Sequence, residues 1–240
     1  MRARRRGRRG DRRGDGRRRP HGRGRGRAAR RRGRARRPAG RARQRLRAQA
    51  RDPADPVAAC ALLRSAEKRI DLAAVGDRTY LGILSAGLDS DANRLANENT
   101  LPLGTAVYAY AALRALAAWK PARWTVTVDG QTREFDGYSV AVSNSGVYGS
   151  GMFLVPDADL EDGLLDVVLS EDIPKRRFLA NLPKVFKGTH TEEPGLHFLR
   201  GRSVSFTADR PFTAYADGDP IAELPATVDV VPGTLRVLAP

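Results

Sequence analysis

The chain has 240 residues, and its 43 Lys and Arg against 27 Asp and Glu give a formal net charge of +16. An excess of this size is typical of nucleic-acid-binding proteins, but here it is confined to one end of the chain. Residues 1–51 hold 25 arginines and two aspartates, a formal charge of +23, so residues 52–240 carry −7. A mildly acidic segment of this length can bury a hydrophobic core. We expect it to have no basic groove and no specific nucleic-acid partner.

The arginine-rich segment, residues 1–51, contains nine residue types, with no aromatic residue, no β-branched residue and no Lys. It offers too little apolar surface to offset the entropy of ordering its backbone, so we predict that it is disordered. One interpretation is a basic tail that binds polyanions non-specifically through counterion release. The other is a wrong-frame translation of GC-rich DNA, because Arg, Ala, Gly and Pro have GC-rich codons.

Other residue types exclude further classes of protein. Cys60 is the only cysteine, which excludes an internal disulfide framework and favours a reducing, cytoplasmic setting. His190 and His197 match no common metal-ligand spacing, and we interpret them as solvated loop residues. The apolar run Leu103–Trp119 is interrupted by Arg114 and predicts a packed helix rather than a membrane span. The N-terminus has no apolar run of the kind a signal peptide requires.

The sequence takes on the texture of a globular domain at Asp52, and we expect residues 52–240 to form that domain. A helix is predicted over 57–68, with Asp55 as N-cap and Pro56 at its first position. Strands over 69–75 and 79–85 follow, and then helices over 89–97 and 104–119. We expect the buried face of the 104–119 helix to consist of four apolar side chains at helical spacing: Val107, Tyr110, Leu113 and Ala117.

The second half of the chain is predicted to be mainly strands, with a helix over 174–187 whose inner side carries Phe178, Leu182 and Val185. The expected strands are 124–128, 132–135, 138–144, 164–170, 204–208, 212–216, 226–231 and 234–238. Strands and helices do not alternate regularly, as they would in a parallel sheet. The sequence therefore predicts a mainly β (α+β) fold, an antiparallel β-sandwich with flanking helices.

Three polar clusters interrupt these apolar strands, and each has a structural and a functional interpretation. In Ser85-Ala-Gly-Leu-Asp89 the carboxylate is either a helix N-cap or a group at the rim of a cleft that holds a substrate hydroxyl or amine. In residues 144–166 a glycine-rich stretch precedes five carboxylates, which form either a solvated acidic turn or a site for a hard cation. Asp217-Gly218-Asp219 is either a hairpin turn or a base with its partner.

The order of these clusters resembles the C-terminal half of the diacylglycerol kinase and sphingosine kinase family, especially its bacterial YegS-type lipid kinases. The resemblance covers roughly residues 52–240. It rests on the Ser-x-Gly-x-Asp element that ends at Asp89, on Gly149-Ser-Gly-Met152, on Asp162-Gly-Leu-Leu-Asp166, and on Asp217-Gly-Asp219 before the last strands. Family members use ATP to phosphorylate a lipid hydroxyl in a cleft between a nucleotide domain and a β-sandwich.

The resemblance also implies roles for individual residues. Asp219 would be the general base, where the family usually has Glu, and Asp217 would help to organise magnesium and water. Asp162, with the backbone carbonyls of Asp159 and Leu164, corresponds to a structural Mg²⁺ site in the bacterial members. Asp89 would contact the lipid head group. We expect Asp162, Asp217 and Asp219 to gather at one wall that faces the acceptor.

The donor side of such a kinase has no counterpart in the sequence. The family's Gly-Gly-Asp-Gly-Thr phosphate loop and its later Gly-Thr-x-Asn-Asp segment do not occur in the 240 residues. The resemblance therefore implies the lipid-binding, base-supplying half of a kinase, inactive alone and peripheral to the inner face of a membrane. Two alternatives stay open: a non-enzymatic arginine-rich binding module, and a kinase for a soluble acceptor such as NAD.

Overall fold

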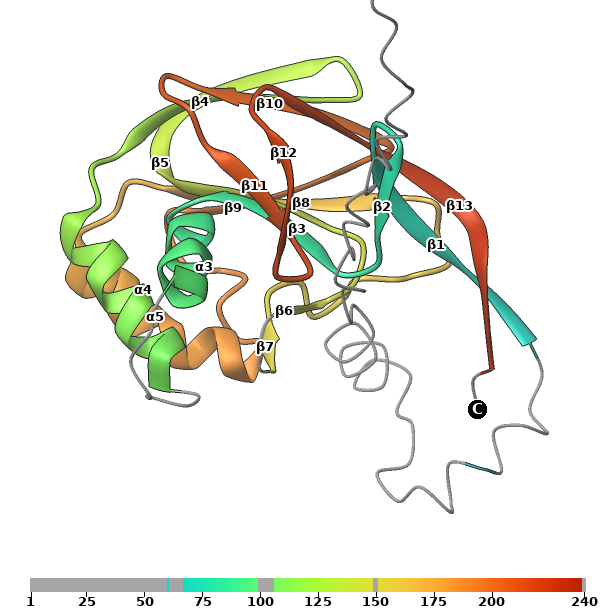
Figure 1. Cartoon of the computed structure of the whole chain (residues 1–240), viewed down its shortest axis with the longest axis horizontal. Helices are drawn as coiled ribbons and strands as arrows, with labels where there is room; N and C mark the ends of the chain where they lie inside the picture. The colour runs from blue at the N-terminus through green and yellow to red at the C-terminus, as the bar shows by residue number, and fades with distance from the viewer. Residues whose placement is uncertain (1–59, 61–66, 99–105, 149–150, 239–240) are drawn as a thin grey trace, which may run out of the picture. The chain divides into compact units, whose positions relative to one another are not determined.

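The computed structural model describes residues 60, 67–98, 106–148 and 151–238 (Figure 1). The predicted disorder of residues 1–51 and nearly all of the predicted 57–68 helix lie outside these ranges. The end of that helix prediction is wrong, because Glu67 and Lys68 begin a strand. No helix in the described ranges is long and apolar enough to cross a membrane.

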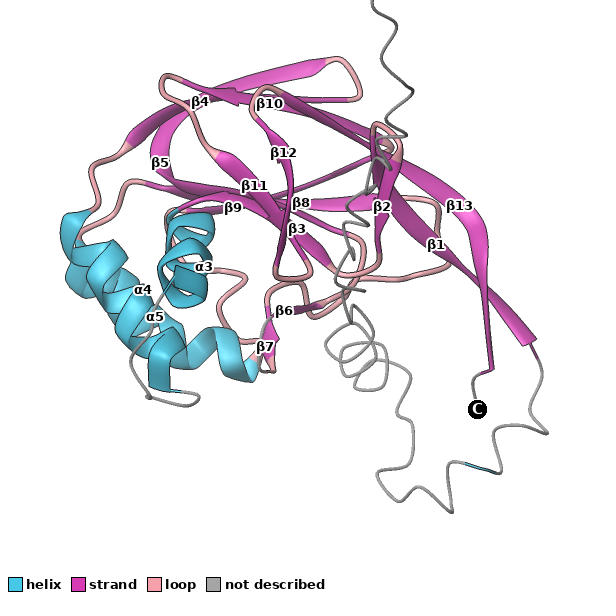
Figure 2. Cartoon of the chain, in the orientation of Figure 1, coloured by secondary structure: helices cyan, strands magenta, loops and turns pink. Residues whose placement is uncertain are grey.

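Strands make up half of the described chain, and three helices accompany them (Figure 2). The first seven strands are β1 (Glu67–Val75), β2 (Arg78–Tyr80), β3 (Ile83–Gly87), β4 (Ala122–Val128), β5 (Gln131–Ser143), β6 (Val147–Tyr148) and β7 (Met152–Phe153). The remaining strands are β8 (Leu165–Glu171), β9 (Leu196–Gly201), β10 (Ser203–Ala208), β11 (Thr213–Ala216), β12 (Asp219–Glu223) and β13 (Ala226–Leu238). The helices are α3 (Leu88–Glu98), α4 (Ala106–Ala118) and α5 (Lys175–Lys187).

Eleven of the strands form one sheet in which every pairing is antiparallel. Its main path runs β12-β11-β3-β5-β4-β10-β13-β1-β2, and β8 pairs with β5 and β9 beside this path. The helices α3, α4 and α5 are grouped on one side of the sheet, at the lower left of Figure 1. The predicted antiparallel β-sandwich with flanking helices is confirmed.

The sheet branches at β5, where the pattern of its neighbours changes along its length. The first half of β5 pairs with β4, and its second half lies between β3 and β8. At the change, Gly137 passes so close to β8 that a Cβ atom there would lie 2.2 Å from the Ser170 carbonyl oxygen. Glycine is the residue that permits such a close approach. The sequence predicted two strands here, but the chain passes through a bulge as one strand.

Aromatic rings connect the sheet to the helices. The rings of Trp124 and Phe212 stack with centroids 5.1 Å apart, and Phe212 lies 5.8 Å from Trp119, which follows α4. Tyr138 of β5 lies 4.7 Å from Phe178 of α5. Aromatic pairs at these separations add about 0.5–1.5 kcal/mol each beyond the burial of their surface. The predicted inner position of Phe178 is therefore confirmed.

The predicted buried face of α4 is wrong. Tyr110 and Leu113 are 43% and 55% exposed, whereas Ala111, Ala115 and Leu116 are buried. Alanine occurs on every side of this helix, so the spacing of the larger apolar residues does not identify the packed face. The small side chains let α4 pack against α3, while Tyr110 and Leu113 are left at the surface.

Several other predictions need correction. His190 is fully buried, and its Nε2 lies 3.0 Å from the Leu154 carbonyl oxygen, so it is not a solvated loop residue. His197 lies in β9, and its Nε2 is 2.8 Å from a carboxylate oxygen of Glu171. The sequence also gave no indication of β9 or β12, and the two predicted closing strands form the single strand β13.

Candidate functional site

The β11–β12 turn carries two of the predicted catalytic carboxylates. Asp217 and Gly218 have positive φ angles of 53° and 96°, as the two central residues of a type I′ hairpin turn require. Asp219 is the first residue of β12, pairs with Ala216 and is exposed. The hairpin interpretation of the Asp-Gly pair is confirmed, and the turn presents the Asp219 carboxylate to solvent.

The Asp217 carboxylate is anchored to the segment that joins β2 to β3. Its Oδ2 accepts hydrogen bonds from the backbone N–H groups of Leu81 (3.1 Å) and Gly82 (3.3 Å). The backbone N–H of Asp217 donates to the Ile83 carbonyl at 3.3 Å. Burial, and secondarily the Asp217 charge, raises the pKa of the nearby Tyr80. Asp217 therefore fixes the turn, and Asp219 is its solvent-facing carboxylate.

Asp89 lies where β3 passes directly into α3. Gly87, the last residue of β3, has a φ of +111°, and a Cβ atom there would lie 2.3 Å from the Tyr138 carbonyl oxygen. The Ser90 hydroxyl accepts from the Gly87 N–H (3.0 Å) and donates to the Gly87 carbonyl (2.9 Å). Since α3 begins at Leu88, Asp89 lies in the first turn of the helix and is not the N-cap.

The surroundings of Asp89 favour its protonated form. Desolvation raises its pKa from 3.8 to about 6, and a hydrogen bond from the Ser139 side chain lowers the pKa in part. A carboxyl group of this kind accepts hydrogen bonds when it is ionised, and it can also donate one as the pH falls towards 6.

Tyr148 brings together polar side chains of β3 and α3, and the sequence alone did not single it out. Its hydroxyl lies 3.0 Å from the Ser85 hydroxyl of β3. Asn93, one turn beyond Asp89 on α3, donates to the same hydroxyl at 3.3 Å. The available signal was the position of Tyr148 within the glycine-rich stretch, but only the fold shows that this stretch lies beside β3 and α3.

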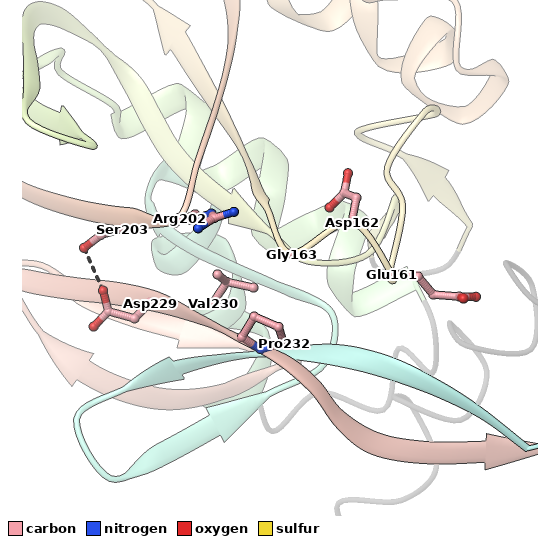
Figure 3. A pocket seen from close by; sticks show the side chains of 8 residues that line it. All are labelled: Glu161, Asp162, Gly163, Arg202, Ser203, Asp229, Val230 and Pro232. Carbon is pink, nitrogen blue, oxygen red and sulfur yellow. Dashed lines mark hydrogen bonds between the residues drawn. The ribbon is translucent and has the colours of Figure 1, made fainter.

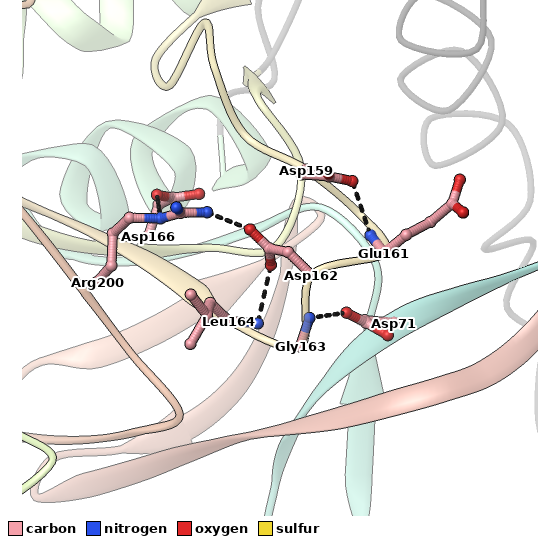
Figure 4. A network of polar contacts seen from close by, with 8 residues as sticks. All are labelled: Asp71, Asp159, Glu161, Asp162, Gly163, Leu164, Asp166 and Arg200. Carbon is pink, nitrogen blue, oxygen red and sulfur yellow. Dashed lines mark hydrogen bonds and ion pairs between the residues drawn. The ribbon is translucent and has the colours of Figure 1, made fainter.

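The acidic loop, residues 157–166, satisfies its carboxylates largely within the chain (Figure 4). Asp159 Oδ1 accepts from the Glu161 N–H, and Asp162 Oδ1 accepts from the Leu164 N–H, both at 2.9 Å. The Arg200 guanidinium ion-pairs with Asp162 Oδ2 and, through Nε at 2.9 Å, with Asp166. Burial raises the pKa of Asp166, and the neighbouring Arg200 opposes that rise.

The predicted magnesium ligands have the right chemistry, but the Asp162 carboxylate is already engaged. Carboxylate and carbonyl oxygens are the donors that Mg²⁺ prefers. However, both Asp162 oxygens take part in contacts, one with Arg200 and the other with the Leu164 N–H. Within the described ranges, no three Asp, Glu, His or Cys side chains form a group that could hold a metal ion. A cation at Asp162 would therefore have to displace the Arg200 guanidinium.

A buried aspartate links the acidic loop to the segment that holds Asp217. The Asp71 carboxylate accepts from the Gly163 and Gly233 N–H groups, each at 2.7 Å (Figure 4). The Asn144 side chain donates to the carbonyls of Asp71 (2.9 Å) and Leu81 (3.0 Å). The same Leu81 donates its N–H to Asp217. Hydrogen bonds thus connect two regions that are far apart in the sequence.

A surface pocket of about 540 Å³ is lined in part by the acidic loop (Figure 3). Its lining includes Glu161, Asp162, Arg202 and Asp229, which gives it three carboxylates and one guanidinium. Asp229 accepts a hydrogen bond from the Ser203 hydroxyl at 2.6 Å. Neither Asp217, Asp219 nor Asp89 lines this pocket.

The predicted site residues therefore fall into three groups. Asp217 and Asp219 share the β11–β12 turn, Asp89 lies in the first turn of α3, and Asp159, Asp162 and Leu164 lie in the acidic loop. β11 pairs with β3, so the chain that leads to Asp89 lies beside the strand that leads to Asp217. The acidic loop is connected to the segment that anchors Asp217 through hydrogen bonds of Asp71 and Asn144. Contacts between the carboxylates of the groups do not make this connection.

Comparison with known proteins identifies related sequences and structures. The family model described as YegS C-terminal NAD kinase beta sandwich-like domain matches residues 82–239. A diacylglycerol kinase of Mycobacterium tuberculosis (strain ATCC 25618 / H37Rv) is 32% identical over 177 residues, which cover 71% of this chain and 57% of the relative. A Pseudomonas aeruginosa (strain UCBPP-PA14) protein named "Probable lipid kinase YegS-like" is 28% identical over 191 residues, 78% of this chain and 62% of the relative.

A solved structure described as a diacylglycerol kinase from Bacillus anthracis str. Sterne shares the fold with a TM-score of 0.61. Its sequence identity is 15%, and the match covers 82% of this chain and 63% of that chain. This chain thus spans just over half the length of the curated diacylglycerol kinase that it matches.

Proposed function

Since the chain belongs to the family with a YegS C-terminal NAD kinase beta sandwich-like domain, we propose that it supplies the acceptor side of an ATP-dependent lipid kinase. The observation that carries this proposal is the β11–β12 turn, where Asp217 is anchored by two backbone N–H groups and Asp219 faces solvent. The proposed acceptor is a lipid hydroxyl, such as that of diacylglycerol.

In the proposed reaction, Asp219 acts as general base. Its carboxylate takes the proton of the lipid hydroxyl while the oxygen attacks the γ-phosphorus of ATP, and ADP leaves with the electron pair of the broken P–O bond. Such transfer depends mainly on positioning and charge stabilisation, so a carboxylate base is sufficient. Asp217 acts as a positioning residue, because its bonds to Leu81 and Gly82 fix the turn that carries Asp219.

Asp89 is the proposed contact for the lipid head group. Its pKa of about 6 lets the carboxyl accept a hydrogen bond from a hydroxyl at neutral pH, and donate one when it is protonated. The Tyr148 and Ser85 hydroxyls and the Asn93 amide add polar groups nearby. We propose that this cluster holds the glycerol end of the acceptor.

Magnesium, when bound, would serve at the acidic loop as a structural ion that neutralises carboxylate charge. In this chain Asp162 and the carbonyls of Asp159 and Leu164 are the proposed ligands, and Arg200 has to release Asp162 for them to serve. The 240-residue sequence does not contain the Gly-Gly-Asp-Gly-Thr phosphate loop. We therefore propose that this polypeptide alone transfers negligible phosphate. Because the proposed acceptor is a lipid, we also propose that the chain acts at the inner face of a membrane.

Transfer of radiolabel from γ-labelled ATP to diacylglycerol tests this proposal. We expect no transfer above background for the 240-residue chain. Transfer that Asp219→Ala abolishes would support the acceptor side but overturn the proposed inactivity of the chain alone. Transfer of equal rate in the parent and Asp219→Ala would overturn the assignment of the base.

A second function, non-specific polyanion binding, rests on the 25 arginines of residues 1–51. We expect a chain without residues 1–51 to lose affinity for a mixed-sequence polynucleotide, and the parent's affinity to fall steeply with salt. If deletion leaves the affinity and its salt dependence unchanged, this second function is excluded.

A further inference from the structure

A basic pocket lies between α3, α4 and the loop that follows β10, apart from the residues to which a role is assigned above. It has a volume of about 460 Å³ and is lined by Asp91, Arg94, Leu95, Arg114, Ala115, Ala118, Trp119, Lys120 and Arg210. This volume lies within the range of roughly 300–1,000 Å³ that is common for small-molecule sites. Four cationic side chains and one carboxylate surround it.

The cations differ in how far they are neutralised. Arg94 lies 3.6 Å from Asp91 and 3.1 Å from Glu98 on its own helix, so its charge is largely balanced. In the part of the chain that the structure describes, no carboxylate forms an ion pair with Arg114, Lys120 or Arg210. The pocket therefore has an excess of positive charge.

Arg210 is held in place by neutral groups. Its guanidinium lies 5.1 Å from the ring centroids of both Trp119 and Phe212, which is the geometry of a cation–π contact. It donates to the carbonyls of Pro121 (3.0 Å) and Lys120. These two bonds use two of its five N–H donors, so the remaining donors are oriented in advance for an acceptor.

Trp119 supplies an independent observation. The side chain lines the pocket and is only 6% exposed, yet its buried indole N–H has no acceptor among the described residues. A buried donor without a partner costs about 1–3 kcal/mol. An oxygen-rich anion in the pocket would provide acceptors for the basic side chains that surround it.

We propose that this basic pocket binds a phosphate group. Phosphate presents several charged acceptor oxygens, which match the planar forks of Arg114 and Arg210 and the ammonium group of Lys120. The phosphate can belong to a phospholipid head group or be free in solution. Leu113 and Tyr110, exposed on the same helix as Arg114, would lie against acyl chains in the first case.

Binding to the full chain tests the proposal with two ligands. The first is inorganic phosphate, followed by equilibrium dialysis at constant ionic strength. The second is a set of phosphatidylcholine vesicles with or without phosphatidylglycerol, followed by sedimentation. The test variant is R114Q/K120Q, and the control is R133Q, which removes a charge from the exposed β5 end of the β4–β5 hairpin. All these proteins keep residues 1–51, so binding by that segment is the same in each and is subtracted as a common background.

We expect R114Q/K120Q to weaken phosphate binding at least 10-fold relative to R133Q. If free phosphate does not bind, but the double variant loses phosphatidylglycerol-dependent sedimentation that R133Q keeps, the site takes a lipid phosphate. Coincident titration curves for parent, R114Q/K120Q and R133Q with both ligands would overturn the proposal. Both positions are exposed, and the single variant R114E repeats the test if the double variant has a lowered Tm.

Discussion

The Asp217 carboxylate lies 3.1 Å from the backbone nitrogen of Leu81, although the two residues are 136 positions apart in the sequence. This contact holds the β11–β12 turn against the start of β3. It separates the roles of the two neighbouring aspartates, since Asp217 is bonded to backbone groups and Asp219 is exposed.

Replacing Asp217 should therefore lower the free energy of unfolding. Asp217→Ala removes the acceptor of two N–H groups and places a Cβ-bearing residue without a polar side chain at a φ of 53°. We expect a loss of about 1–3 kcal/mol in urea denaturation. Asp217→Asn, which keeps one acceptor oxygen and tolerates positive φ, should lose less. The control Asp219→Ala should change stability by no more than about 0.5 kcal/mol, and an equal effect of all three variants would contradict this account.

Gly87 and Gly76 form a matched pair for testing the β3–α3 junction. Both have positive φ, but a Cβ atom would lie 2.3 Å from the Tyr138 carbonyl oxygen at Gly87 and would meet nothing within 4 Å at Gly76. Gly76→Ala should cost about 1–2 kcal/mol from backbone strain alone. Gly87→Ala adds a backbone clash and should cost clearly more, with a correspondingly larger drop in Tm. Equal drops would show that the β3–α3 junction is looser than described.

The buried face of α4 can be tested with two leucines on one helix. Leu116 is 4% exposed and Leu113 is 55% exposed. Leu116→Ala should reduce the free energy of unfolding by about 2–5 kcal/mol, whereas Leu113→Ala should change it by less than about 0.5 kcal/mol. A larger loss for Leu113→Ala than for Leu116→Ala would contradict the observed packing and support the buried face expected from the sequence.

Asp89 should make stability depend on pH in a defined window. Its folded-state pKa of about 6 lies above the ordinary value of 3.8 for an aspartate, so the folded state binds the proton more tightly. Stability from this group is fully present below the unfolded pKa and is lost as the pH rises through the folded pKa. We expect the free energy of unfolding of the parent, relative to Asp89→Asn, to fall between about pH 4 and pH 6. A flat difference across this window would show that Asp89 is well solvated.

The sequence predicted most of the β structure because strand periodicity and Asp-Gly turns are local signals. It also placed α3, α4 and α5 correctly to within a few residues, and it identified the inner side of α5 at Phe178. The buried face of α4 was mispredicted because its alanines are buried by contact with α3. The sequence of α4 alone does not show that contact. His190 looked polar and exposed because no local signal shows that the chain folds over it.

The candidate site was predictable only as separate pieces. The resemblance selected Asp89, Asp162, Asp217 and Asp219, but no spacing could show that Arg200 occupies Asp162 or that Leu81 anchors Asp217. Tyr148 was missed for the same reason, since its contacts with Ser85 and Asn93 connect residues more than 50 positions apart. These contacts depend on how the strands pair, which a single sequence does not display.

The most direct test of the acceptor-side proposal is binding of diacylglycerol by the 240-residue chain itself. The measurement is sedimentation with phosphatidylcholine vesicles with and without diacylglycerol, at high salt so that residues 1–51 contribute little. We predict that diacylglycerol increases the sedimented fraction, that Asp89→Ala removes this increase, and that the control Asp209→Ala keeps it. No increase with diacylglycerol, or an increase that Asp89→Ala leaves intact, would contradict the assignment.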